Sequence, residues 1–88
     1  MVSRVTALFW ENYHSLSIFV QRIADKKYRL WLTQPQYSSL SFKRLQWLET
    51  LYSVRIGLRY LALAYRDDKI YTWVWIGSHA DYDKLLQS

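Results

Sequence analysis

A group of side chains able to carry charge or exchange protons follows the last apolar segment of this 88-residue sequence. The segment, residues 70–76, alternates in the period-two pattern of a strand buried on both faces, and Gly77 with Ser78 is expected to end it. The group that follows consists of His79, Asp81, Tyr82, Asp83 and Lys84. A histidine, whose ordinary pKa is about 6.5, can donate or accept a proton at neutral pH. The pattern predicts a site for acid–base chemistry in a loop held by a rigid strand.

Most of these residues also have a purely structural interpretation. Asp81 and Asp83 are expected to be solvated or to cap a helical turn rather than to form a catalytic carboxylate pair. Tyr82 could close the edge of the core instead of binding a ligand. Trp73 and Trp75 share one face of the alternating strand, and we expect them in the core rather than as base-stacking platforms.

The overall charge indicates what such a site would bind. Twelve Lys and Arg residues against seven Asp and Glu residues give a net charge of +5, which favours a nucleic acid or an acidic protein as partner. The sequence contains no cysteine, so disulfides and thiolate metal sites are excluded. The two histidines and scattered carboxylates do not form a metal-binding pattern, and we expect no cofactor.

The hydrophobic pattern argues against a membrane protein. No apolar run approaches the ~20 residues that a membrane span requires, and Glu11 and His14 interrupt any signal-peptide core at the N-terminus. We therefore expect a cytoplasmic protein without a membrane partner.

The first half of the chain is predicted to form a strand and helices. Residues 4–8 are expected to form a strand, and residues 9–13 a short helical turn. Residues 18–32 carry a clear helical period, with Val20, Ala24 and Trp31 among the residues on one face. Phe19 is expected at the margin of that face. The helix ends before a proline at position 35.

Two serines are candidates for the N-cap of that helix, Ser15 and Ser17. We favour Ser17, because the periodic segment starts directly after it.

The second half is predicted to form an antiparallel meander. A polar linker at 34–41 precedes a segment at 42–48 in which Lys43 and Arg44 lie between apolar residues. Three candidate strands at 51–56, 60–65 and 70–76 are separated by short turns, as antiparallel pairing requires. A last helical turn is expected at 83–87. The prediction is a single α+β domain over residues 1–88, with the N-terminal strand and helices packed on an antiparallel sheet of three to four strands.

Several motifs in this order carry a family resemblance. They are Phe9-Trp10, Phe42-Lys43-Arg44-Leu45, Tyr52-Ser53-Val54-Arg55-Ile56-Gly57, Arg59-Tyr60 and Trp75-Ile76-Gly77-Ser78-His79-Ala80-Asp81-Tyr82. With them the sequence resembles the RelE/ParE superfamily of bacterial toxins from type II toxin–antitoxin pairs, in its RelE/HigB-like branch. The resemblance implies a RelE-like α+β fold and a cognate antitoxin as partner. It also implies messenger RNA cleavage, often on the ribosome, with operator DNA bound only through the antitoxin complex.

The resemblance also implies roles for individual residues. In such cleavage the ribose 2′-hydroxyl is the nucleophile, so the protein supplies acid–base groups and phosphate contacts. His79 matches a position where some members carry a histidine that acts as acid or base. The other implied contacts are Arg55, Arg59 and Tyr82 at the phosphate or a base, and Lys43 and Arg44 along the RNA.

One position departs from the family pattern. The hairpin that usually ends Gly-Tyr-Arg here reads Arg59-Tyr60-Leu61, with leucine in place of arginine. Activity could survive if Arg59 reaches the same region. Three hypotheses follow from the resemblance: an endoribonuclease that inhibits translation, a ParE-like inhibitor of DNA gyrase without RNA chemistry, and a degenerate member that only binds its antitoxin.

Overall fold

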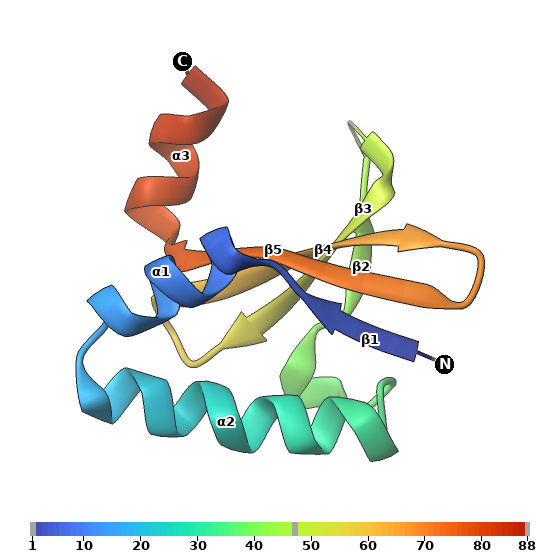
Figure 1. Ribbon diagram of the computed structural model, residues 1–88, viewed down its shortest axis with the longest axis horizontal. Helices are drawn as coiled ribbons and strands as arrows, with labels where there is room; N and C mark the ends of the chain where they lie inside the picture. The colour runs from blue at the N-terminus through green and yellow to red at the C-terminus, as the bar shows by residue number, and fades with distance from the viewer. Residues whose placement is uncertain (1, 47, 88) are drawn as a thin grey trace.

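The protein is built around one mixed sheet with helices on both faces (Figure 1). The computed structural model describes residues 2–46 and 48–87. The strand order is β1-β5-β4-β3-β2, with β1 parallel to β5 and the other neighbours antiparallel. The elements are β1 (Val2–Val5), α1 (Ala7–Ser15), α2 (Ile18–Thr33), η1 (Ser38–Leu40), β2 (Lys43–Leu45), β3 (Leu48–Ile56), β4 (Tyr60–Asp67), β5 (Ile70–Ser78) and α3 (His79–Gln87).

The α+β prediction is confirmed, and the sheet is larger than expected. It has five strands rather than three to four, because Lys43–Leu45 pairs with β3 as an additional edge strand. The first strand is Val2–Val5 rather than residues 4–8. Thr6 ends it, since its Oγ1 accepts a 3.1 Å hydrogen bond from the N–H of Phe9 and so caps α1.

The α2 helix follows its sequence signals closely. Its N-cap is Ser17, as predicted, because the Ser17 Oγ accepts a 3.2 Å hydrogen bond from the N–H of Val20. Val20, Ala24 and Trp31 are buried against the sheet. Phe19 was expected at the margin of this face, but it is 72% exposed and therefore lies outside it.

Two hydrophobic clusters lie on opposite faces of the sheet, because neighbouring residues of a strand point to opposite sides. The main cluster lies toward α2 and includes Trp31, Leu40, Val54, Trp73 and Ile76. The smaller one, here called the second cluster, consists of Leu51, Leu61 and Leu63, with Leu45, Leu48, Val74, Trp75 and Tyr82 packed against it. Figure 1 shows α2 below the sheet and α3 above it. Leu40 lies in the expected linker, yet it is fully buried.

A β-bulge in β5 separates the two tryptophans that the alternation placed together. Trp73 pairs with Ala64 and Trp75 pairs with Leu63, so Val74 is an extra residue without a counterpart in β4. Trp73 therefore belongs to the main cluster, whereas Trp75 packs against the second cluster. The expectation that both share one face was wrong, although both do pack against the core.

The helices also bear on the membrane question. No helix in the described part of the chain is both long enough and apolar enough to cross a bilayer.

Candidate functional site

A groove on the second-cluster face brings together residues from four elements. Its volume is about 790 Å³. The polar and charged residues that line it include Lys43, Arg44, Ser53, Arg55, His79 and Tyr82. Its apolar lining includes Leu58, Leu61 and Leu86. Five of the six site residues expected from the sequence thus lie at one groove; the exception is Arg59.

Strand register explains why these residues meet. Lys43 pairs with Ser53 across β2 and β3. Arg55 pairs with Leu61 across β3 and β4, and Leu61 pairs with Gly77 of β5. Ser53, Arg55 and Leu61 all line the groove. Because α3 begins where β5 ends, the helix rises from the end of the sheet at which Arg55, Leu61 and Gly77 lie (Figure 1).

His79 is the first residue of α3, not a loop residue as predicted. The strand continues through Ser78, and the helix follows without a connecting loop. Ser78 starts the helix, because its Oγ accepts a 3.1 Å hydrogen bond from the N–H of Asp81. The N–H of His79 donates a 2.8 Å bond to the carbonyl oxygen of Arg59, while its imidazole is exposed. The expected helical turn at 83–87 is thus a helix of nine residues.

Gly77 has a packing role rather than a strand-breaking one. A Cβ atom at this position would lie 2.6 Å from Cζ2 of Trp75. Glycine lets the indole lie flat over the strand, and the indole in turn packs against Tyr82, with ring centroids 6.2 Å apart. Tyr82 is therefore both a member of the second cluster and part of the groove wall.

The cations of the groove are exposed and have no carboxylate beside them in its lining. Lys43, Arg44 and Arg55 are all exposed, and the described residues that line the groove include no Asp or Glu. Arg55 is steadied by a 3.0 Å hydrogen bond from its Nε to the carbonyl oxygen of Gly57. Concentrated positive charge at a concave surface attracts polyanions.

Arg59 differs from the other predicted site residues. Its side chain is exposed and is not among those that line the groove, while its carbonyl oxygen holds His79. The structure thus gives Arg59 a backbone role at the site.

Leu61 forms part of the groove floor. It is 6% exposed and belongs to the second cluster. The position where the family pattern has arginine is therefore filled by a packed, apolar side chain.

Sequence reasoning missed Ser53 as a groove residue. Its side chain is 6% exposed and lines the groove beside Arg55. A signal was present, because Ser53 is the polar residue in an otherwise apolar stretch of β3 between Leu51 and Val54.

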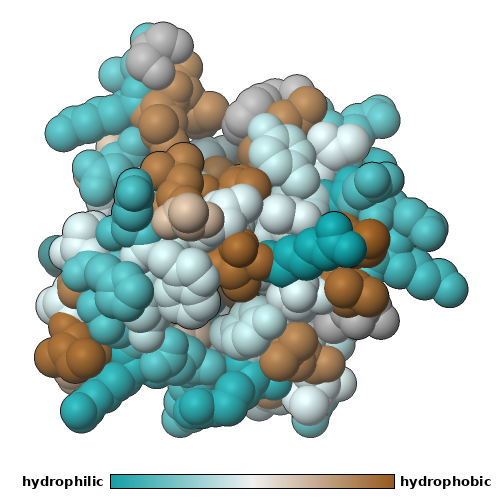
Figure 2. All heavy atoms as spheres, viewed as in Figure 1, coloured by the Kyte–Doolittle hydropathy of each residue, from teal (hydrophilic) through white to brown (hydrophobic). Residues whose placement is uncertain are grey.

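The α3 wall of the groove combines His79 and Tyr82 with the apolar Leu86. Leu86 is about half exposed, and Figure 2 shows hydrophobic residues gathered over this helix. The groove therefore combines basic side chains with apolar ones such as Leu58, Leu61 and Leu86, an arrangement suited to a ligand with both phosphates and flat rings.

Comparisons with known proteins agree with this architecture. The chain is similar to YafQ from E. coli strain BL21(DE3), with a TM-score of 0.74 at 12% identity over 91% of this chain and 94% of that one. It is similar to the YoeB/ParE toxin from Agrobacterium tumefaciens, with a TM-score of 0.69 at 13% identity over 90% and 99%. The RelBE2 toxin–antitoxin complex from Mycobacterium tuberculosis matches with a TM-score of 0.69 at 18% identity over 89% and 96%. At these identities the likeness shows a shared fold.

Family membership comes from the sequence itself. A search of curated proteins finds no match. The family model of the ParE-like toxin domain, however, matches residues 19–84. This segment covers most of the chain and contains every described residue of the groove except Leu86. The chain belongs to the ParE-like toxin family.

Proposed function

We propose that this protein is the toxin of a type II toxin–antitoxin pair and that it cleaves messenger RNA in the groove. The observation that carries the proposal is the meeting of His79, Arg55 and Lys43 at one concave surface without a carboxylate in its described lining. A histidine and cationic side chains at one groove supply the acid–base group and the phosphate contacts that cleavage by a ribose 2′-hydroxyl needs.

The chemistry assigned to the site has two proton transfers. The 2′-oxygen attacks the neighbouring phosphorus as a base takes its proton, and the bond from phosphorus to the 5′-oxygen breaks as an acid protonates that oxygen. The products are a 2′,3′-cyclic phosphate and a 5′-hydroxyl. His79 transfers one of these protons as acid or base, and water transfers the other. Arg55 stabilises the charge that builds up on the phosphate oxygens, for which a guanidinium fork is well suited.

The remaining groove residues hold the substrate. Lys43 and Arg44 contact the RNA backbone from the edge strand β2. Tyr82, supported by Trp75, stacks on a base or orients the phosphate. Arg59 contributes by fixing His79 through its carbonyl oxygen, and its guanidinium remains a candidate phosphate contact. We place the reaction in the cytoplasm, on RNA engaged with the ribosome.

The chain offers a matched pair of histidines for testing this assignment. Induced expression of the wild-type protein should arrest growth and stop translation. His79→Ala should abolish both effects, whereas His14→Ala, which changes the exposed histidine of α1, should leave them intact. Continued growth with intact, folded wild-type protein would overturn the proposal.

Purified protein tests the chemistry directly. Messenger RNA incubated with the wild-type protein, with and without ribosomes, should yield fragments ending in a 2′,3′-cyclic phosphate. Equal cleavage by the His79→Ala variant would show that the nuclease is a contaminant or that another group is catalytic.

The proposed partner is a cognate antitoxin protein. One of the similar structures is a toxin–antitoxin complex, and the basic surface of this chain would attract an acidic partner. The antitoxin should suppress growth arrest when co-expressed, and operator DNA should be retained by the complex but not by the toxin alone.

Leu61 favours a second candidate function. A leucine packed into the groove floor removes the arginine expected at that position, and a ParE-like member could instead inhibit DNA gyrase without RNA chemistry. In that case expression would cause DNA damage and filamentation while translation continues, and His79→Ala would remain toxic. Complex formation with the antitoxin but no toxicity at any expression level would indicate a degenerate toxin.

A further inference from the structure

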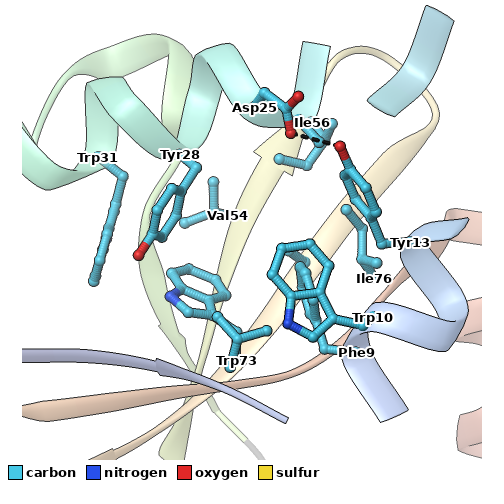
Figure 3. A pocket seen from close by; sticks show the side chains of 13 residues that line it. Phe9, Trp10, Tyr13, Asp25, Tyr28, Trp31, Val54, Ile56, Trp73 and Ile76 are labelled. Carbon is cyan, nitrogen blue, oxygen red and sulfur yellow. Dashed lines mark hydrogen bonds between the residues drawn. The ribbon is translucent and has the colours of Figure 1, made fainter. Parts of the chain in front are cut away.

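A second cavity lies on the opposite face of the sheet, between α1, α2 and the main cluster (Figure 3). Its volume is about 170 Å³. Aromatic side chains supply much of its wall: Phe9, Trp10, Tyr13, Tyr28, Trp31 and Trp73. Aliphatic residues of β3, β4 and β5, such as Val54 and Ile76, form the floor. None of these residues lines the groove except Val54, so the cavity is a separate feature.

The aromatic rings form two walls that face a common space. On one side, Trp10 and Tyr13 of α1 meet edge to face, with centroids 5.2 Å apart. On the other, Tyr28 of α2 and Trp73 of β5 meet in the same way at 6.4 Å. Figure 3 shows these four rings arranged around the opening. The gap between the walls is therefore bounded by π systems on several sides.

Hydrogen bonds hold the second wall in place. The hydroxyls of Tyr28 and Ser3 are 2.8 Å apart, and the Nε1–H of Trp73 donates to the same serine oxygen at 3.2 Å. These bonds limit ring rotation, so this wall does not need to be ordered when a ligand enters.

One carboxylate lies at the edge of the cavity. Asp25 of α2 is the only acidic residue among the described residues that line it. Its Oδ1 accepts a 2.8 Å hydrogen bond from the hydroxyl of Tyr13, a bond that bridges the two walls (Figure 3). The carboxylate is thus fixed beside the aromatic rings, although the protein as a whole carries a charge of +5.

These features have a defined ligand chemistry. The faces of aromatic rings carry negative electrostatic potential and attract cations, most strongly where water is excluded. A cavity of about 150 Å³ is large enough for a molecule the size of benzene. We propose that this cavity binds a small organic cation through an alkylammonium head, with Asp25 as its counter-charge. The proposal does not depend on the proposed function of the groove.

Choline and its neutral isostere 3,3-dimethylbutan-1-ol provide the test. The two probes share shape and hydroxyl, and differ only in the positive charge. Titration of the full chain, followed by the tryptophan indole N–H signals in NMR spectra, should show saturable shifts with choline. The neutral isostere should bind at least about fivefold more weakly. Equal binding of both probes, or binding of neither, would overturn the proposal.

Three variants locate the site and its charge. Asp25→Asn keeps the shape and a hydrogen-bond acceptor for Tyr13, and should weaken choline binding about threefold while leaving the isostere unaffected. Trp10→Leu removes one exposed ring and should weaken choline binding about tenfold. Asp83→Asn, on the exposed surface of α3, is the matched control and should change nothing. Choline affinity that survives both Asp25→Asn and Trp10→Leu would contradict the assignment.

Discussion

The backbone N–H of His79 donates a 2.8 Å hydrogen bond to the carbonyl oxygen of Arg59. This bond joins the turn between β3 and β4 to the first residue of α3. The bond fixes the backbone of His79 relative to the end of β3, where Arg55 lies. The geometry of the site therefore depends on backbone features around it as much as on the side chains proposed to act in cleavage.

The two glycines that flank this arrangement should respond differently to substitution. Gly77→Ala places a methyl group against the ring of Trp75 and should lower the free energy of unfolding by about 1–3 kcal/mol. Gly57→Ala meets no atom within 4 Å, but its φ of +70° is strained for alanine, at a cost of about 1 kcal/mol. Urea unfolding measures both. Near-ultraviolet circular dichroism tests the packing of Trp75. The spectrum should change in Gly77→Ala alone, and unchanged spectra in both variants would refute the packing role.

The serine pair before α2 tests which residue caps the helix. Ser17→Ala removes the acceptor for the N–H of Val20 and should cost about 1 kcal/mol of stability. Ser15→Ala removes only an exposed hydroxyl that donates to the carbonyl oxygen of Asn12, and should change stability by less than about 0.5 kcal/mol. Thermal unfolding of both variants measures the difference. A reversal of their order would mean that the helix begins elsewhere in solution.

Local sequence signals predicted the regular elements well. The helical period and the cap at Ser17 located α2, and short turns between apolar runs located the antiparallel strands. The bulge at Val74 left no such trace, because Val74 and Trp75 are both apolar and either could face a core. Whether an extra residue is accommodated depends on packing across the sheet, which alternation along one strand does not encode.

Two sequence signals at the start of α3 pointed to different structures. Ser78 followed three residues later by Asp81 is a helix-start pattern, but Gly77 beside it more commonly marks a break. Here the glycine serves the indole of Trp75 instead. The groove itself was predicted only as a set of residues, since their meeting requires the register of β2, β3 and β4.

Tyr13 should make stability depend on alkaline pH. Burial, followed by the hydrogen bond to Asp25, raises the pKa of the Tyr13 phenol above its ordinary value of 10.0. Because the folded state favours the protonated phenol, this contribution is complete below about pH 10 and is lost as pH rises through the higher folded-state pKa. The stability gap between wild type and Tyr13→Phe should therefore narrow above about pH 10. A gap that stays constant as the pH rises through this range would contradict the prediction.

Restoring the family's arginine should trade stability for activity. Leu61→Arg forces a charged side chain into a position that is 6% exposed and packed in the second cluster, at an expected cost of about 2 kcal/mol or more. If the proposed reaction is correct, the added guanidinium lies beside Arg55 and should raise the cleavage rate per folded molecule. Leu61→Met conserves volume and should cost less than about 1.5 kcal/mol without a rate change. Urea unfolding and single-turnover cleavage separate the two effects, and a lower rate in Leu61→Arg would show that the apolar floor is itself required.

The edge strand β2 should control the salt dependence of RNA binding. If Lys43 contacts a phosphate, one counterion fewer is released when the Lys43→Gln variant binds RNA. The negative slope of log affinity against log salt concentration should therefore become shallower by roughly 0.7 for single-stranded RNA. Lys69→Gln, in the turn between β4 and β5, carries the same charge change and is not among the residues that line the groove. Its slope should match the unsubstituted protein. Measuring both by fluorescence anisotropy in the His79→Ala background prevents cleavage during the titration. Equal losses of slope in the two variants would mean that RNA responds to the net charge of the protein rather than to the groove.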